Sequence, residues 1–172
     1  NVEKDFEYLG LVSENPMNLI GRPNLPANNM TELMGWINAN KGKINIANAG
    51  PGSASHLCGM LFQSTLKVDM TSVPYKGTAP AMTDILGGQV DLMCDQTTNT
   101  TQQIESGKVK AFAVTTLKPL TTPALAKLPT LDSQGLKGFN VTIWHGLYAP
   151  KGTPKAVVDT VNAALRQALK DP

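Results

Sequence analysis

Apolar and polar positions along the chain predict an alternation of short strands and amphipathic helices. The predicted strands are 6–12, 17–20, 44–47, 70–73, 90–94, 109–114 and 141–149. The predicted helices cover about 29–40, 53–66, 78–86, 98–106, a short stretch at 130–134, and a last segment from 153 onward. Strands that alternate with helices favour right-handed βαβ units, so we expect an α/β fold with a largely parallel sheet flanked by helices.

The pattern changes after Thr116, where Pro119, Pro123 and Pro129 interrupt a linker-like stretch. A long strand and a final helix follow this stretch. We therefore predict a domain boundary near residues 115–120.

Composition excludes several classes of protein. The 172 residues suffice for one full core or two modest domains, and 15 basic against 13 acidic residues leave a net charge of +2. This balance argues against a nucleic-acid partner and against a polybasic membrane surface. No apolar run approaches the roughly 20 residues that span a bilayer. The chain starts at Asn1 without an initiator Met or signal peptide, which we interpret as a segment of a longer protein whose targeting signal lies outside it.

Three loops that follow predicted strands carry the candidate chemistry, and they begin at Asn48, Tyr75 and Asp95. In a parallel sheet these loops share the carboxyl edge, where open α/β folds bind ligands. Each loop combines small or hydroxyl residues with the start of a helix, whose free N–H groups attract anions. Several helix N-termini at one place would bind a small carboxylate without any arginine.

Other chemistries find little support in the motifs. The glycine pattern from Gly50 reaches Ser55 where a dinucleotide fingerprint needs glycine, and the nucleophile elbow of hydrolases is absent. We expect no cofactor and no metal site. Asp95 and His56 remain the acid–base pair of an alternative, enzymatic interpretation. Cys58 lies on an apolar helix stripe and Cys94 on a strand, so we expect buried free thiols rather than a disulfide.

The same loops resemble the Bug receptors, the TctC-type substrate-binding proteins of tripartite tricarboxylate transporters. The resemblance covers nearly the whole chain in order. Its most specific stretches are Val73-Pro74-Tyr75-Lys76-Gly77 and Gly87-Gly88-Gln89-Val90-Asp91, with further matches at Gly52–Leu57 and Gly146–Pro154.

The resemblance implies a secreted periplasmic receptor of the type II-like binding-protein fold, whose two lobes close on a small organic anion. It assigns 1–11 to an inter-lobe crossing strand, 12–116 to a complete lobe, and 117–172 to a segment that returns to the other lobe. Carried over by position, the ligand-binding residues are Gly52, Ser53, Ser55, Tyr75, Gly77, Thr78 and Asp95.

Three functions are therefore open at this point: a carboxylate receptor, an enzyme acting on a small organic acid, and a ligand-sensing domain fused to a signalling module. The receptor hypothesis implies membrane permease subunits as partners. It also implies that the missing first-lobe segment, or a second copy of the chain, covers the exposed face of the lobe.

Overall fold

The computed structural model describes residues 2–170, which divide into two compact units. The larger unit is Asn15–Ile143. The smaller unit combines the described residues up to Glu14 with those from Trp144 onward. The first and the last of the described residues thus both lie in the smaller unit.

The sheet of the larger unit has the order β3-β2-β4-β1-β5. Its strands are β1 (Phe6–Gly21), β2 (Asn45–Asn48), β3 (Thr71–Pro74), β4 (Leu92–Gln96) and β5 (Lys110–Val114). β2 pairs in parallel with β3 and β4, whereas β1 runs antiparallel to both β4 and β5. The expected α/β fold with a largely parallel sheet is confirmed, with β1 as the reversed strand.

The elements differ from the sequence prediction in two places. The strands expected at 6–12 and 17–20 are a single 16-residue strand, β1, which also pairs with β6 (Thr142–Pro150). The short helix expected at 130–134 is wrong, because residues 131–135 form turns. Gly135 has a positive φ of 100° and Asp132 accepts a hydrogen bond from the Gly138 N–H at 2.8 Å, so the chain bends there instead of coiling.

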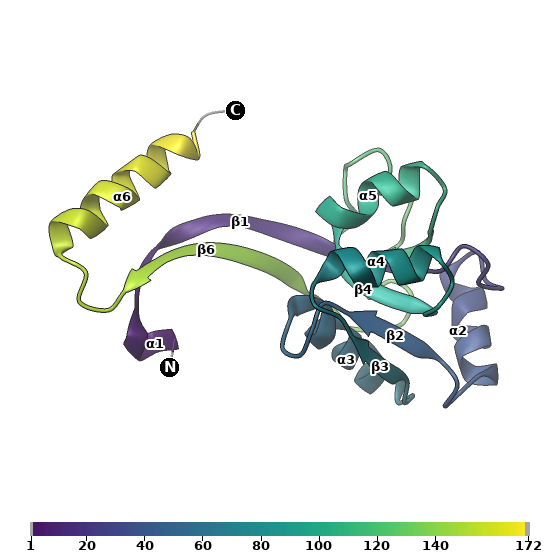
Figure 1. The fold of residues 1–172 in the computed structure, drawn as a ribbon. Helices are drawn as coiled ribbons and strands as arrows, with labels where there is room; N and C mark the ends of the chain where they lie inside the picture. Colours follow the sequence, from purple (N-terminus) through teal and green to yellow (C-terminus); the bar gives the residue numbers. More distant parts are fainter. Residues whose placement is uncertain (1, 171–172) are drawn as a thin grey trace. The chain divides into compact units, whose positions relative to one another are not determined.

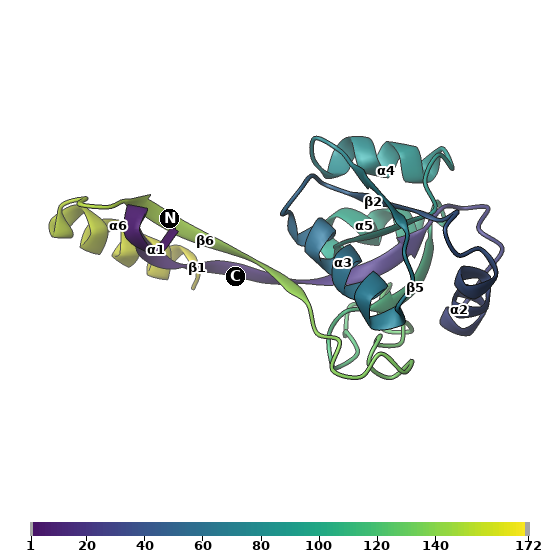
Figure 2. The ribbon, with the colours of Figure 1, turned by 90° about the horizontal axis from the view of Figure 1, so that it is seen from below.

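Helices cover both faces of the sheet (Figures 1 and 2). α2 (Met30–Ala39) and α3 (Ala54–Leu66) pack on one face, and α4 (Thr78–Leu86) and α5 (Thr97–Glu105) on the other. Side chains of β4 point alternately to the two faces. Leu92 and Cys94 pack in the apolar cluster on the α2 and α3 face, and Met93 packs in the apolar cluster on the α4 face. Asp95, the next residue on the Met93 side, therefore faces α4 and α5 at the end of the strand.

The cysteines are bonded, which corrects the expectation of free thiols. Cys58 of α3 and Cys94 of β4 form a disulfide with their Cα atoms 6.0 Å apart. Their expected burial is confirmed, since each is only 1% exposed. The pairing depends on α3 lying across β4, a packing that spacing in the sequence does not reveal.

The segment 117–143 packs within the larger unit. Thr130 forms a β-bridge with Val114, and Leu131, Leu136 and Phe139 join the core beneath α2 and α3. Contacts within this chain thus divide it at 14/15 and 143/144, not near 115–120. The assignment of 12–116 and 117–172 to the two lobes of a whole receptor stays a prediction.

The smaller unit holds the first part of β1, most of β6, the short α1 (Val2–Asp5) and α6 (Lys155–Ala168). α6 lies beside β1, where Asn162 Nδ2 donates to the Leu9 carbonyl. Gly10 permits this approach, because a Cβ there would lie 2.8 Å from Leu165 Cδ2. Leu9 is the one buried apolar side chain among its described residues. No helix within residues 2–170 combines the length and apolar character that a membrane crossing requires.

Candidate functional site

The carboxyl ends of β2, β3 and β4 meet at one edge of the larger unit. Asn48 is in register with Pro74, and Ala47 with Met93. α3, α4 and α5 begin just beyond these ends, so the three predicted loops do lie along the same edge of the sheet. The antiparallel neighbour β1 reaches this edge too, where Asn18 pairs with Asp95.

The first loop is held by its own polar groups. The buried Asn48 side chain donates from Nδ2 to Ser72 Oγ at 2.9 Å and accepts from the Gly50 N–H at 3.0 Å. Gly52 has a φ of 77°, and its N–H donates to His56 Nδ1 at 3.1 Å. Ser53 caps α3, with its Oγ accepting from the His56 N–H at 3.2 Å. Gly52 and Ser53 therefore define a rigid, partly exposed start of α3.

The second loop ends at Gly77, whose φ of 103° and ψ of 175° are open to glycine and strained for other residues. The Gly77 N–H donates to the Ala49 carbonyl at 3.3 Å and so joins the second loop to the first. Tyr75 Oη donates to Asp84 Oδ2 at 2.6 Å. Two causes raise the pKa of Tyr75 to about 12: the larger is loss of hydration, and the smaller is this hydrogen bond to the Asp84 carboxylate. Tyr75 thus stays a protonated hydroxyl that joins the second loop to α4.

Asp95 connects the N-termini of two helices. It is 4% exposed, and it accepts from Thr78 Oγ1 of α4 at 3.5 Å and from Asn99 Nδ2 of α5 at 3.1 Å. Burial raises the pKa of Asp95 above its ordinary range, while the hydrogen bonds from Asn99, the Gln96 backbone and Thr78 oppose this shift. Ser55, 3% exposed, donates from Oγ to the Cys94 carbonyl at 2.6 Å. The polar groups of Asp95 and Ser55 are therefore occupied within the protein.

The stability of the protein should depend on pH through Asp95. A raised pKa in the folded state means that the contribution of Asp95 is fully present below its unfolded-chain pKa of 3.8 and is lost as the pH rises through the folded-state pKa. The unfolding free energy of the wild type minus that of Asp95→Asn should therefore fall as the pH rises above 3.8 and through the folded-state pKa of Asp95. Urea unfolding at several pH values measures this difference.

Asp132→Asn is the matched control, because the Gly138 N–H, and then Lys137, lower the pKa of Asp132. The stabilisation by Asp132 is present above its unfolded-chain pKa and is lost as the pH falls through its folded-state pKa. The unfolding free energy of the wild type minus that of Asp132→Asn should therefore rise with pH. If the two free-energy differences changed with pH in the same way, a raised pKa of Asp95 in the folded protein would be contradicted.

Asn18 is a polar residue of this edge that the sequence analysis missed. It is fully buried beside Asp95, and neither Oδ1 nor Nδ2 has a hydrogen-bond partner among the described residues. Buried amides almost always have partners, so this one marks an unusual position. The available signal was a lone Asn inside the apolar run Met17–Ile20.

The structure gives Asp95 and His56 different partners. Asp95 binds Thr78 and Asn99, whereas the ring of His56 accepts the Gly52 N–H. No hydrogen bond joins the two side chains within residues 2–170. That part of the chain also holds no cluster of His, Cys, Asp and Glu suited to a metal ion.

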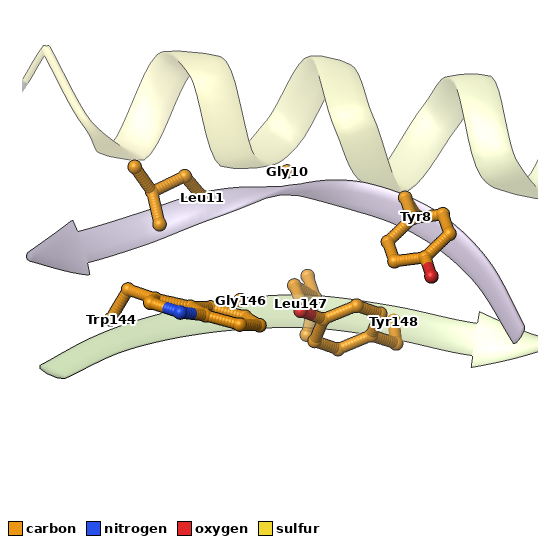
Figure 3. A pocket seen from close by; sticks show the side chains of 7 residues that line it. All are labelled: Tyr8, Gly10, Leu11, Trp144, Gly146, Leu147 and Tyr148. Atoms are coloured by element: carbon orange, nitrogen blue, oxygen red, sulfur yellow. The ribbon is translucent and has the colours of Figure 1, made fainter. Parts of the chain in front are cut away.

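A separate apolar pocket of about 310 Å³ lies in the smaller unit (Figure 3). The ring of Tyr148 is 5.3 Å from that of Tyr8 and 6.4 Å from that of Trp144. Gly146 leaves room for this arrangement, since a Cβ there would lie 2.7 Å from Tyr148 Oη. The residues that line the pocket are Tyr8, Gly10, Leu11, Trp144, Gly146, Leu147 and Tyr148. None of the candidate loop residues belongs to it.

Comparison with protein families matches residues 1–172 to the family described as "Tripartite tricarboxylate transporter family receptor". A UPF0065 protein from the TAR-I ttuE-ttuC' intergenic region of Agrobacterium vitis is 45% identical over 169 residues, which are 98% of this chain and 48% of that protein. Protein BugT of Bordetella pertussis is 29% identical over 169 residues and is covered to 51%. The chain thus spans about half the length of these relatives.

Solved structures show the same fold. The periplasmic binding protein BugD is 59% identical with a TM-score of 0.91, over 97% of this chain and 55% of BugD. MatC from Rhodopseudomonas palustris, with bound malate, is 38% identical with a TM-score of 0.91, over 99% of this chain and 57% of MatC. Another R. palustris protein, with adipate, is 30% identical with a TM-score of 0.89, over 96% of this chain and 55% of that protein.

Proposed function

This chain belongs to the tripartite tricarboxylate transporter receptor family, and on that basis we propose that it captures a small organic anion between two lobes. The ligand is a mono-, di- or tricarboxylate. Backbone N–H groups and hydroxyls at the N-termini of α3, α4 and α5 bind it, and the loaded receptor delivers it to membrane permease subunits. The malate and adipate bound to two relatives support this class of ligand.

The observation that carries the proposal is the pair of helices that begin side by side without a side-chain cap. α4 starts after Gly77 and α5 after Gln96, and neither of these residues caps its helix with a side-chain hydrogen bond. The first N–H groups of an α-helix have no partner within the helix, and the helix dipole makes that end partly positive. Two such ends beside the first turn of α3 supply donors for a carboxylate without a basic side chain.

The seven candidate residues divide into two roles. Gly52, Ser53, Gly77 and Thr78 lie at the exposed or half-buried starts of α3 and α4, and they contact the ligand. Ser55 and Asp95 are buried behind them, and the hydroxyl of the half-buried Tyr75 is bonded to Asp84, so these three residues support the site from behind. A buried carboxylate beside an anion would repel it, so Asp95 serves the site by holding two helices in place.

The protein acts in the periplasm. BugD, the relative at 59% identity, is a periplasmic binding protein. The Cys58–Cys94 disulfide supports the same location, because such bonds persist in oxidising compartments and are rare in the cytosol.

A thermal-shift screen of the full-length protein tests the proposal. Mono-, di- and tricarboxylates are compared with their neutral amides, which keep the shape of each acid and remove its charge. A ligand present at 100 times its Kd stabilises the native state by about 2.7 kcal/mol, so a true ligand should raise Tm in a concentration-dependent way. A shift for an acid and none for its amide supports the anion receptor. Equal behaviour of every acid and amide would overturn it.

The smaller unit supplies the partner surface of the proposed receptor. Its side chains Tyr8, Leu11 and Trp144 are each more than half exposed, and a group of exposed apolar side chains marks an interaction surface. We propose that the missing first-lobe segment covers these side chains in the whole receptor. In its absence, a second copy of the chain can cover them.

The 172-residue chain by itself is therefore expected to self-associate as its concentration rises. Tyr8→Ser/Trp144→Ser should weaken this association about tenfold or more, which corresponds to ~1.4 kcal/mol. Sedimentation velocity measures the effect. Leu117→Ser, which changes an exposed leucine of the larger unit, is the control. A strictly monomeric wild-type chain at high concentration would contradict the prediction.

A further inference from the structure

The Cys58–Cys94 disulfide lies directly behind the candidate site. Cys58 is three residues beyond Ser55 in α3, and Cys94 precedes Asp95 in β4. Each cysteine is 1% exposed. The bond therefore joins the first half of α3 to Cys94 of β4. The residue after Cys94 is Asp95, which contacts α4 and α5.

A hydrogen bond reinforces the same junction. Ser55 Oγ donates to the carbonyl of Cys94 at 2.6 Å, so the first two turns of α3 are attached to one residue of β4 through both a polar and a covalent contact. Asp95 then accepts from Thr78 at the start of α4 and from Asn99 in the first turn of α5. The Cys94-Asp95 pair is thus the common attachment point of three helix N-termini.

We propose that the disulfide is a positioning element of the binding site, which fixes the N–H donors of α3 relative to those of α4 and α5. This inference rests on the proposed function and adds a determinant of affinity to it. Hydrogen bonds weaken steeply as their geometry departs from linear, so a small shift of α3 would misalign its donors toward a ligand held by α4 and α5. Holding the donors in place before the ligand arrives raises affinity, because binding then orders less of the protein.

The coupling must also act in reverse. Dithiothreitol reduces the bond to two thiols by supplying two electrons and two protons, and it closes to its own cyclic disulfide. If the oxidised receptor binds a carboxylate more tightly than the folded, reduced one, the carboxylate must favour the oxidised form by the same factor.

The test compares oxidised wild type with Cys58→Ala/Cys94→Ala, at a temperature where circular dichroism shows both folded. Calorimetry measures the Kd of the acid with the largest thermal shift, and hydrogen exchange measures the amides of Ser53–Leu57. We expect a Kd at least about tenfold higher in the double variant and faster exchange in the first turn of α3. Cys58→Ala/Cys94→Leu, in which leucine fills the space of the lost sulfurs, replaces the double alanine variant if that one does not fold.

Leu33→Ala is the matched control, because it lowers stability through a cavity at α2 in the same core cluster as the cysteines and leaves the disulfide in place. Its Kd should stay within about twofold of wild type. A Kd within about twofold in a folded cysteine variant, or unchanged exchange at Ser53–Leu57, would overturn the positioning role. Failure of the proposed function gives a different result, in which oxidised wild type binds no acid. Hydrogen exchange in wild type and the cysteine variant would still show whether the disulfide holds α3 in place.

Discussion

Replacing Gly77 with valine is expected to weaken carboxylate binding at least about 100-fold, which is ~3 kcal/mol or more, while the protein stays folded. Gly77 has a φ of 103° and a ψ of 175°, a conformation that a β-branched residue does not adopt without strain. Nothing lies within 4 Å of a Cβ at this position, so the backbone conformation, not a steric clash, causes the effect. Relief of the strain would rotate the start of α4 and turn its N–H groups away from the ligand. Calorimetric titration measures the change.

Gly88→Val is the matched control for this substitution. Gly88 follows the other end of α4, has a φ of 72°, and also has open space around a Cβ. It should lower stability to a similar extent and leave Kd nearly unchanged. Equal losses of affinity in the two variants would show that the effect comes from a general distortion of α4, and would remove Gly77 from the binding site.

Loss of the disulfide should lower the free energy of unfolding by about 4 kcal/mol, because the bond closes a loop with a sequence separation of 36 residues. Removing it increases the entropy of the unfolded chain. For a unit of this size the change corresponds to a fall in Tm of roughly 10–15 °C. Urea unfolding of wild type and Cys58→Ala/Cys94→Ala measures the loss.

The control for this prediction is reductant. Dithiothreitol should move the wild-type unfolding midpoint toward that of the double variant and should leave the midpoint of the double variant where it is. A double variant within about 1 kcal/mol of oxidised wild type would show that the loop-entropy account is wrong for this bond.

Local patterns were sufficient to predict the alternating elements of the larger unit. β2 and β4 contain short apolar runs that are followed by Asn48 and Asp95, and each of β2, β3 and β4 is followed by a helix. Asn29, for example, caps α2 by accepting the Glu32 N–H at 2.9 Å, and Asn is one of the residues that favour this position. Because strands in such units are parallel, their carboxyl ends share an edge, and the three candidate loops could be grouped from the sequence.

Features that depend on packing between distant segments could not be predicted in the same way. The polar residues 13–15 divide the apolar pattern of β1, yet the strand continues through them because β6 pairs alongside. Ser13 Oγ, for instance, lies 3.3 Å from Nδ1 of His145. The disulfide likewise requires α3 to cross β4, and spacing alone is compatible with two free thiols.

The candidate site shows the same division between local and long-range information. The loops that contain Ser53 and Gly77 were identifiable from their small and hydroxyl residues at helix starts, and the family resemblance singled out these two residues. The roles of Asp95 and Ser55 were not, because they depend on which groups their side chains reach: Thr78 and Asn99 for Asp95, and the Cys94 carbonyl for Ser55. Asn18 required knowledge of the strand beside it, since only its pairing with Asp95 places it at the edge.

The division of the chain into units has a consequence for the order of folding. Asn15–Ile143 is continuous, whereas the smaller unit needs residues from both ends of the chain. A chain that emerges N-terminus first, from the ribosome or an export channel, can complete the larger unit before β6 and α6 are available. β1 and the start of β6 are then already anchored, because Val141 N donates to the Thr115 carbonyl at 3.1 Å and Thr115 N to that of Met17 at 3.0 Å. The pairing of β6 with β1 becomes a local extension, and the smaller unit forms last.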